Sequence, residues 1–359
     1  MRTMIRLAKT LAVLVFCWFM GGCGCECGKN SQPVGEGKLM KPRVGFMLPE
    51  KYNSPDGMTI GKDGCIYLSV NNVVLPQHPA KILRITPDDK LEEIVTLPPH
   101  PETGRASPLG VAFGSDGNLY VADCQAFNTK EPGKSRLLRV NMKDGKAAGC
   151  DVVAVGFNMS NGVAAKGDCI YVCETTLNKE TPMPSGVYRF AIAELDAKNP
   201  AKVTGLNDPR LIVKLSTQSK EHFNGANGLD IDAAGNMYVC NFGDGEVHKM
   251  TFDAAGKVAT QALLAKGHGM ESSDGLHCDP AGNLWVADFL GNAVVRIDSK
   301  TGAVAIVVKN GESDGADGSL HSPSECIVRG NKLYVSNINL TYGPHKSSKF
   351  YTISVVDLK

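Results

Sequence analysis

The sequence carries almost no excess charge, because 38 Lys and Arg residues face 37 Asp and Glu residues and leave a net charge of +1. Aromatic residues are also scarce, at 6%. A domain that binds nucleic acid or steers a charged partner carries a marked charge imbalance, and this one does not. The composition therefore excludes nucleic acid as an expected partner. With 39 glycines, it favours a single β-rich domain.

A long hydrophobic run is missing near the N-terminus, where the apolar stretch Thr10–Met20 is too short for a comfortable membrane span. The basic residues Arg2, Arg6 and Lys9 precede it, and two glycines and Cys23 follow it. This arrangement resembles a bacterial lipoprotein signal in which Cys23 is acylated. Ordinary secretion with cleavage nearby is the competing interpretation.

These features predict the domain organisation and the location. Residues 1–22 are expected to form the signal peptide, 23–41 a flexible tether and 42–359 the folded domain. The protein is then exported, and it is either anchored as a lipoprotein at the periplasmic side or the cell surface, or secreted. Any contact with a membrane is expected through the lipid alone.

Twelve cysteines would suggest disulfides in an exported chain, but their positions argue against a dense framework. Cys65 and Cys169 occupy one equivalent strand position, and Cys173 and Cys240 occupy another. Cysteines that recur inside strands usually behave as small buried hydrophobic residues. No two of the cysteines show, within a loop, the spacing that is typical of a zinc site.

A short pattern recurs six times: an apolar strand entered through glycine, a tight turn, and a second strand that ends aromatic–Val or similar. The spacing is about fifty residues, with one longer gap. The copies begin at Asp56, Leu109, Asn161, Asn227, Asp274 and Ser324, and their second strands contain Tyr67, Tyr120, Tyr171, Tyr238, Trp285 and Tyr334. Self-similarity at this period predicts an all-β, six-bladed β-propeller.

Third and fourth strands complete each repeat except the last. Fourth strands are expected at Leu91–Leu97, Leu211–Leu215 and Ala303–Val308. After Phe350–Val356 the final repeat is one strand short, and the natural partner for its open edge is Arg43–Leu48. The N- and C-terminal strands are therefore predicted to close one blade together.

Polar residues of the repeats are expected to converge near the propeller axis. Because first and second strands are antiparallel, the start of one and the end of the other lie at the same face. The first ring contains Asp56, Asn161, Asn227 and Asp274. The second ring contains Asp123, Glu174, Asn241, Asp288 and Asn337.

This set of carboxylate and amide oxygens, with few basic residues, favours a hard divalent cation, most plausibly Ca²⁺. Asp and Asn before Gly are also common turn formers, so any single member could only cap its own backbone. Turn formation alone does not easily explain why Asp, Asn or Glu recurs at the same position in most repeats of both rings. Asn161 and the five residues of the second ring, Asp123, Glu174, Asn241, Asp288 and Asn337, are expected to bind substrate.

The repeats resemble those of the regucalcin and gluconolactonase family of calcium-dependent sugar-lactone hydrolases. The resemblance is carried by Asn227–Asp230 with its Tyr–Val strand, and by Ser273–Leu276 followed by Gly282–Ala287. It implies a single divalent cation held by an acidic residue of the first blade, an Asn of the fourth and an Asp of the fifth. By motif these positions are Asp56, Asn227 and Asp274, and Asp56 matches the family pattern least well.

Two departures weaken a transfer of function. The family often carries an Arg shortly before the third-blade motif, where this chain reads Asn158-Met159-Ser160. The strands Pro108–Phe113 and Gly117–Asp123 also resemble NHL repeats, whose propellers often bind partners without catalysis. A metal-dependent hydrolase of a lactone or small ester is the leading hypothesis, and a non-enzymatic binding propeller with a protein partner is the alternative.

For a hydrolase, a proton acceptor near neutral pH is needed. Asp274 could act both as metal ligand and as base. His222, His268 and His321 precede first strands by a few residues and are candidate catalytic bases, because the ordinary pKa of histidine suits proton transfer near neutral pH.

Overall fold

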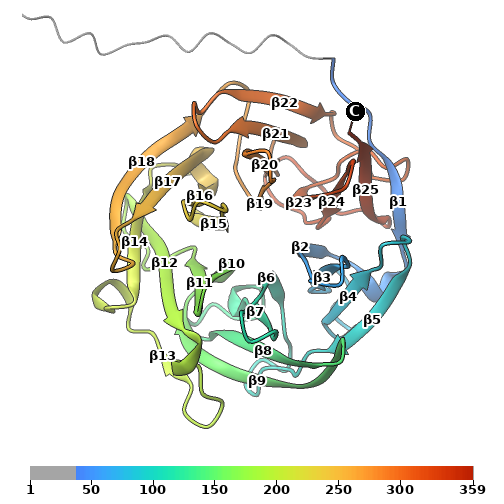
Figure 1. Cartoon of the computed structure of the whole chain (residues 1–359). Helices are drawn as coiled ribbons and strands as arrows, with labels where there is room; N and C mark the ends of the chain where they lie inside the picture. Colours follow the sequence, from blue (N-terminus) through green and yellow to red (C-terminus); the bar gives the residue numbers. More distant parts are fainter. Residues whose placement is uncertain (1–37, 359) are drawn as a thin grey trace, which may run out of the picture. The chain divides into compact units, whose positions relative to one another are not determined.

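The six repeats form six β-sheets arranged in a ring around a central axis (Figure 1). The structure is a computed structural model that describes residues 38–358. The predicted signal peptide, Cys23 and most of the tether lie outside the described residues. Each blade is built on four antiparallel strands, which confirms the predicted six-bladed propeller. Within residues 38–358, no helix is long and apolar enough to cross a membrane.

The first three blades follow the chain in order, from the innermost strand outward. Their strands are β2 (Pro55–Ile60), β3 (Ile66–Val70), β4 (Lys81–Ile85) and β5 (Leu91–Thr96); β6 (Pro108–Phe113), β7 (Leu119–Asp123), β8 (Ser135–Lys143) and β9 (Lys146–Phe157); and β10 (Ser160–Lys166), β11 (Cys169–Glu174), β12 (Met183–Ala191) and β14 (Leu211–Thr217). The second blade gains a short fifth strand, β13 (Ala201–Lys202), which pairs parallel to β9. The insertion before β14 supplies this strand.

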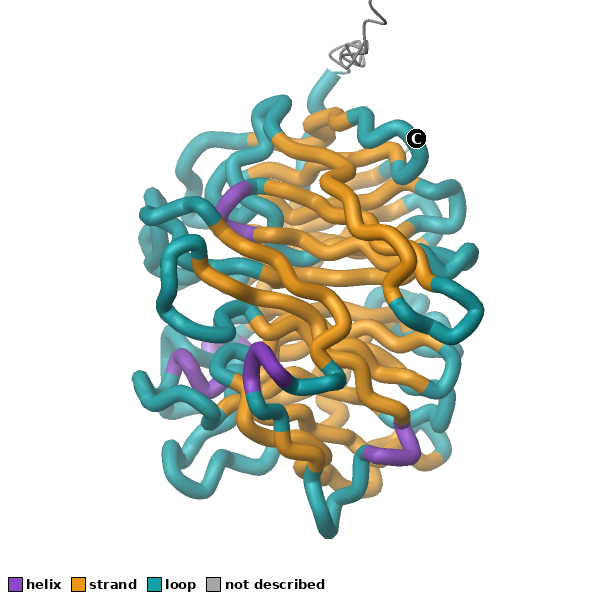
Figure 2. Tube along the Cα trace, turned by 90° about the vertical axis from the view of Figure 1, so that its left-hand side faces the viewer, coloured by secondary structure: helices purple, strands orange, loops and turns teal. Residues whose placement is uncertain are grey.

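The remaining blades are built in the same way. Their strands are β15 (Ala226–Ile231), β16 (Met237–Asn241), β17 (Glu246–Phe252) and β18 (Val258–Lys266); β19 (Leu276–Cys278), β20 (Asn283–Asp288), β21 (Ala293–Asp298) and β22 (Val304–Lys309); and β23 (Pro323–Arg329), β24 (Lys332–Asn337), β25 (Tyr351–Asp357) and β1 (Arg43–Leu48). Short 3-10 helices lie in the connections: η1 (Glu50–Tyr52), η2 (Gln125–Phe127), η3 (Ile192–Glu194), η4 (Gly205–Asn207) and η5 (Phe242–Asp244). The connecting loops gather at the two ends of the strands (Figure 2).

Strand β1 closes the ring, as predicted. It pairs antiparallel with β25, so that Arg43 lies opposite Val355 and Leu48 opposite Tyr351. The first and last strands therefore share one sheet, and neither leaves a free edge at the seam.

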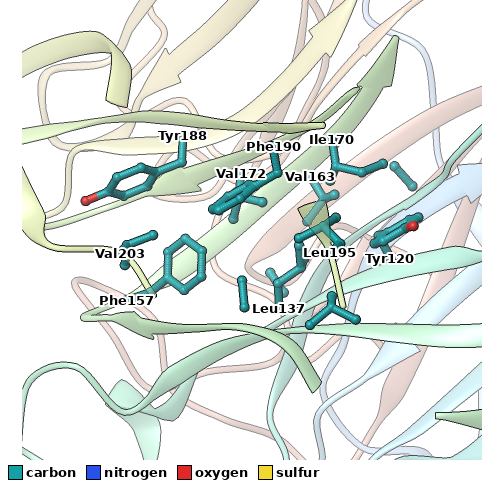
Figure 3. Packing of buried hydrophobic residues seen from close by; sticks show 14 of the residues in the cluster. Tyr120, Leu137, Phe157, Val163, Ile170, Val172, Tyr188, Phe190, Leu195 and Val203 are labelled. Atoms are coloured by element: carbon teal, nitrogen blue, oxygen red, sulfur yellow. The ribbon is translucent and has the colours of Figure 1, made fainter. Parts of the chain in front are cut away.

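The hydrophobic core is distributed between neighbouring blades. One cluster joins Tyr120 and Phe157 of the second blade to Tyr188 and Phe190 of the third (Figure 3). The rings of Phe157 and Tyr188 pack edge to face with centroids 5.5 Å apart. Because each sheet buries its faces only against its neighbours, the blades stabilise one another.

The tight turns recur for a structural reason. In four blades the aromatic residue of the second strand donates a hydrogen bond to the Asp of the turn before it. The pairs are Tyr67–Asp63 at 3.0 Å, Tyr120–Asp116 at 2.9 Å, Tyr238–Asp232 at 2.9 Å and Trp285–Asp279 at 2.9 Å. The Asp anchors both its own turn and the buried ring, which explains why the two residues recur together.

The eight cysteines within the described range are free, as expected for residues that recur in strands. Five of them are buried: Cys65, Cys124, Cys173, Cys240 and Cys326.

Candidate metal and substrate site

The innermost strands β2, β6, β10, β15, β19 and β23 surround the axis, and glycine allows them to approach closely (Figure 1). Five repeats carry glycine one residue after their first position: Gly57, Gly110, Gly162, Gly228 and Gly275. A Cβ atom on Gly110 would lie 2.6 Å from the carbonyl oxygen of Asn161 in the next blade. Gly228 also donates its N–H to the carbonyl oxygen of Asp274 at 3.0 Å. Only glycine permits this close backbone contact.

In four blades a local irregularity interrupts the regular pairing of the innermost strand at the residue before the glycine. In β2 the register shifts between Pro55 and Met58, and in β15 between Ala226 and Leu229. The unpaired residues include Asp56 and Asn227. Such a bulge bends the strand and redirects a side chain that regular pairing would hold elsewhere.

The redirected side chains form the floor of a pocket of about 170 Å³ at one end of the axis. Asp56, Asn161, Asn227 and Asp274 all border it. The structure therefore brings together the three predicted metal ligands and one of the six predicted substrate-binding residues. Their metal-binding and substrate-binding roles stay predictions.

Hydrogen bonds organise this floor. Asn227 lies beside the carboxyl group of Asp274 and Ser324 beside that of Asp56, and each of these polar neighbours lowers the pKa of its carboxyl group. The backbone N–H of Asp274 donates to the carbonyl oxygen of Ala287 at 2.8 Å. The polar groups beside the two carboxyl groups thus carry no positive charge.

The carboxyl groups at the axis are electrostatically uncompensated. Burial raises the pKa of Asp56 to about 7. Burial raises the pKa of Asp274 well above its ordinary value, and the charges of Asp56 and Glu325 raise it further. Among the side chains that border the pocket within the described range, none is basic. Buried carboxylates without a base favour either protonation or a bound cation.

The donor set fits a hard cation. Carboxylate and amide oxygens at the floor are the ligand types that Ca²⁺ prefers. In the part of the chain that the structure describes, no three His, Cys, Asp or Glu side chains are close enough to hold a metal by themselves. A cation at this floor would therefore need amide oxygens, such as that of Asn227, and water beside the two aspartates.

Glu325 is a functional candidate that the sequence analysis did not single out. It occupies the position at which the other five repeats have glycine. Its backbone neighbour Cys326 donates an N–H to its Oε1 at 2.8 Å. Burial raises the pKa of Glu325 well above its ordinary value, with further contributions from Asp56 and Asp230. Glu325 is the one exception among six repeats at a position that is otherwise glycine, and this exception could have identified Glu325 from the sequence.

A second cavity, of about 250 Å³, lies between the same innermost strands. Glu325 borders this cavity together with Asp230 and His277. Asp230 accepts hydrogen bonds from the N–H groups of Ile231 and Cys278, both at 2.8 Å, and lies 3.4 Å from Nδ1 of His277. Glu325 thus borders this cavity and also interacts electrostatically with the floor of the pocket.

The predicted second ring is buried and bonded to the protein itself. Asp288 accepts from the N–H groups of Glu271 at 2.9 Å, Ser272 at 2.7 Å and Gly291 at 3.1 Å. Glu174 accepts from those of Asn158 and Met159. Burial raises the pKa of Glu174 to about 8, although these backbone bonds lower it.

The other members of the second ring are bonded similarly. Asp123 accepts from the N–H of Ser107 at 2.7 Å and forms a buried ion pair with Arg136. Asn337 accepts from the N–H of His321 at 2.9 Å, and Asn241 accepts from the hydroxyl of Thr217 at 2.7 Å. Most of the second ring therefore fixes the loops that enter the first strands. None of its five residues borders the pocket, and their substrate-binding role stays a prediction.

The three candidate catalytic histidines occupy different environments. The ring of His222 lies 5.9 Å from that of Tyr342, which borders the pocket. His268 is exposed on the loop between β18 and β19 and has a positive φ of 55°. His321 is buried, and its Nδ1 contacts the carbonyl oxygen of Ser313. Of these three, His222 alone contacts a residue of the pocket wall.

The pocket wall includes a segment that sequence reasoning missed. Ile338, Leu340 and Tyr342 come from the long loop between β24 and β25, and they pack on Phe242 and Phe289. The β16–β17 and β20–β21 connections, which carry Phe242 and Phe289, are its shorter counterparts. Because the sequence of the β24–β25 loop does not repeat in them, periodicity carried no signal for it.

Comparisons with known proteins agree with the resemblance. The family described as SMP-30/Gluconolactonase/LRE-like region matches residues 184–313. This segment is less than half of the chain, and it contains Asn227 and Asp274 but not Asp56. No curated protein sequence matches the chain.

Solved structures extend the likeness to nearly the whole chain. A luciferin-regenerating enzyme shares 16% identity over 88% of this chain and 95% of its own, with a TM-score of 0.58. A regucalcin from Agrobacterium tumefaciens, described as a calcium-binding protein, shares 14% over 89% and 96%, with a TM-score of 0.56. A gluconolactonase from Xanthomonas campestris shares 16% over 92% and 99%, with a TM-score of 0.53. At these identities the likeness shows the fold.

The chain thus folds as a six-bladed β-propeller, as the sequence predicts, and residues 184–313 are similar to the SMP-30/gluconolactonase family.

Proposed function

We propose that the protein is an exported, calcium-dependent hydrolase that opens a lactone or a small ester. The observation that carries this proposal is the floor of the axial pocket, where two buried carboxyl groups and two amides face an open space without a basic partner. The match of residues 184–313 to the gluconolactonase-like family supports the same reaction class.

Asp56, Asn227 and Asp274 would hold the cation. When bound, Ca²⁺ supplies Lewis acidity that polarises the carbonyl group of a substrate. The carboxylates confine the substrate's reactive group to the floor, because the rest of the pocket offers few polar atoms. Asn161, which also borders the floor, is placed to donate a hydrogen bond to the substrate.

Asp274 is the proposed proton acceptor. Burial and the neighbouring carboxyl groups raise the pKa of Asp274 in the metal-free protein, whereas a bound cation opposes this shift. The proposed role of Asp274 as base therefore rests on its position at the floor of the pocket. His222 is the second candidate, since its ring lies beside Tyr342 at the edge of the pocket.

The test measures calcium binding by calorimetry and turnover on a panel of lactones and small esters, with the full mature chain. Chelation should abolish turnover, and added Ca²⁺ should restore it. Asp274→Asn should lose both binding and turnover, whereas the matched change Asp298→Asn, at the outer end of β21, should lose neither. Calcium binding without turnover on any lactone or ester would instead support the non-enzymatic binding propeller.

Export is tested separately. Mass spectrometry of the mature N-terminus should find an acylated Cys23, and Cys23→Ser should release the protein from the membrane fraction. A mature chain that begins elsewhere and carries no lipid would support ordinary secretion.

A further inference from the structure

The walls of the axial pocket differ in chemistry from its floor. Apart from Asn224, the lining side chains outside the floor are apolar or aromatic: Phe127, Met159, Phe242, Phe289, Ile338, Leu340 and Tyr342. None of the residues that border the pocket in the described range is Lys or Arg. A ligand would therefore meet oxygen ligands at one end and hydrocarbon along its sides.

The few polar groups in the wall are partly engaged with one another. Asn224 donates from Nδ2 to the hydroxyl oxygen of Tyr342 at 3.0 Å. Burial raises the pKa of Tyr342, and the charge of Asp274 raises it further, so this hydroxyl stays protonated at neutral pH. This bond uses one amide N–H of Asn224 and a lone pair of the Tyr342 oxygen. The wall therefore offers a ligand few polar groups, chiefly the Tyr342 O–H and the Asn224 amide oxygen.

The apolar wall is supported by packing between blades. The ring of Tyr342 lies 6.1 Å from that of Phe242 and 5.9 Å from that of Phe289. Behind Phe289, the buried His345 contacts its carbonyl oxygen through Nε2 at 2.7 Å. Residues of the fourth, fifth and sixth blades thus hold the wall in one arrangement, which favours a preformed pocket.

The size of the pocket suits a small ring. A dry cavity of about 150 Å³ lined by Leu, Ile and Phe binds benzene in another protein. At about 170 Å³, this pocket has room for a six-membered ring and a short substituent.

A sugar lactone is poorly matched to these walls. Each hydroxyl pressed against Phe or Ile loses its hydrogen bonds to water without a replacement, which weakens binding by about 5- to 100-fold per group. A methylene in the same position gains about fourfold, the equivalent of about 0.8 kcal/mol.

We propose that the pocket accepts a lactone or ester with an apolar ring or short acyl chain and rejects polyhydroxylated sugar lactones. This inference rests on the proposed hydrolase function. It concerns the ligand class, which binding measurements test independently of turnover.

The experiment compares δ-valerolactone, its homologues with alkyl chains of increasing length, and glucono-δ-lactone as substrates of the calcium-loaded protein. We expect kcat/KM to rise by two- to fourfold for each of the first few methylenes. We expect kcat/KM for the sugar lactone to be at least 100-fold below that of the alkyl lactone of similar size.

Wall variants give the structural control. Phe127 and Leu340 border the pocket, and Phe127 is 39% exposed, so Phe127→Ser should not unfold the protein. Phe127→Ser and Leu340→Ser should each reduce the gain per methylene. The matched change Leu263→Ser, at a 52% exposed leucine of β18 outside the pocket, should leave both turnover and the gain unchanged.

Binding separates failure of this inference from failure of the proposed reaction. Alkyl-substituted δ-lactams, which resist hydrolysis, are titrated calorimetrically against the polyhydroxylated lactam of the same ring size. Tighter binding of the alkyl lactams supports the inference even if no lactone is turned over. Equal or tighter binding of the polyhydroxylated lactam, equal turnover of the sugar lactone, or wall variants that behave like Leu263→Ser would overturn it.

Discussion

The carboxyl group of Glu325 lies over Gly275, so close that a Cβ atom on this glycine would be 2.6 Å from Glu325 Oε1. Asp274, one of the residues at the floor of the pocket, directly precedes Gly275 in the sequence. Glu325 thus adds a third buried carboxyl group to the axis, beside Asp56 and Asp274. In five blades this repeat position is a glycine that allows close packing. In the sixth blade it is Glu325, which raises the pKa of Asp274.

Replacing Glu325 should therefore shift the pH dependence of calcium binding. The charge of Glu325 raises the pKa of Asp274, so Glu325→Gln should lower the pH at which Asp274 becomes available as a ligand. Calorimetric titrations from pH 5 to pH 8 should show a profile displaced to lower pH. An unchanged profile would mean that Glu325 does not influence Asp274. A loss of affinity at all pH values would make Glu325 a ligand itself.

The floor residues should carry most of the calcium affinity. Asp274→Asn and Asn227→Ala each remove an oxygen ligand from a small set, so each should weaken binding by at least tenfold. At a concentration 100 times Kd, calcium should stabilise the wild type by about 2.7 kcal/mol, and the variants by much less. Thermal unfolding with and without calcium measures the difference. Equal shifts for both variants and for Asp298→Asn would place the metal elsewhere.

Stability of the metal-free protein should fall as the pH rises from about 4 to about 7. The folded chain holds a proton on Asp56 until its pKa of about 7, whereas the unfolded chain releases it near the ordinary value. The folded state therefore binds more protons in this window, and each pH unit costs up to about 1.4 kcal/mol per such group. Urea unfolding in the presence of chelator measures this slope. Added calcium should flatten it, and a rising slope would contradict the assigned pKa.

Asp288 should prove important for stability. Asp288→Ala leaves the N–H groups of Glu271, Ser272 and Gly291 without their acceptor, so we expect a loss of about 2–4 kcal/mol in the free energy of unfolding. Urea unfolding of the calcium-free variant checks this. A variant of unchanged stability but reduced substrate affinity would instead support the predicted role of Asp288 in substrate binding.

Of the three candidate histidines, only His222 lies near enough to the pocket to act as the base in place of Asp274. Its ring lies beside Tyr342, whereas His268 is exposed on an outer loop and His321 contacts Ser313. His222→Gln should lower kcat with unchanged calcium affinity if it is the base. Full activity of His222→Gln would assign the proton transfer to Asp274, and reduced activity of His268→Gln would refute the placement argued above.

The sequence by itself determined the number of blades, the closure through β1 and the positions of Asp56, Asn227 and Asp274 at the axis. These features follow from local rules that every repeat obeys, namely strand alternation, turn residues and glycine at the point of closest approach. A property that recurs in each repeat is readable without knowing how the repeats pack.

The tertiary structure alone decided three other features. Asp123, Glu174 and Asp288 look like binding residues in the sequence, yet their partners are backbone N–H groups of loops that only folding brings near. Glu325 acquires its influence on Asp274 only when the sixth blade packs against the fifth. The apolar wall arises from Tyr342 and its neighbours, which contact Phe242 and Phe289 across long sequence separations. Burial and long-range contact set the chemistry of these groups, and neither is encoded in the repeat pattern.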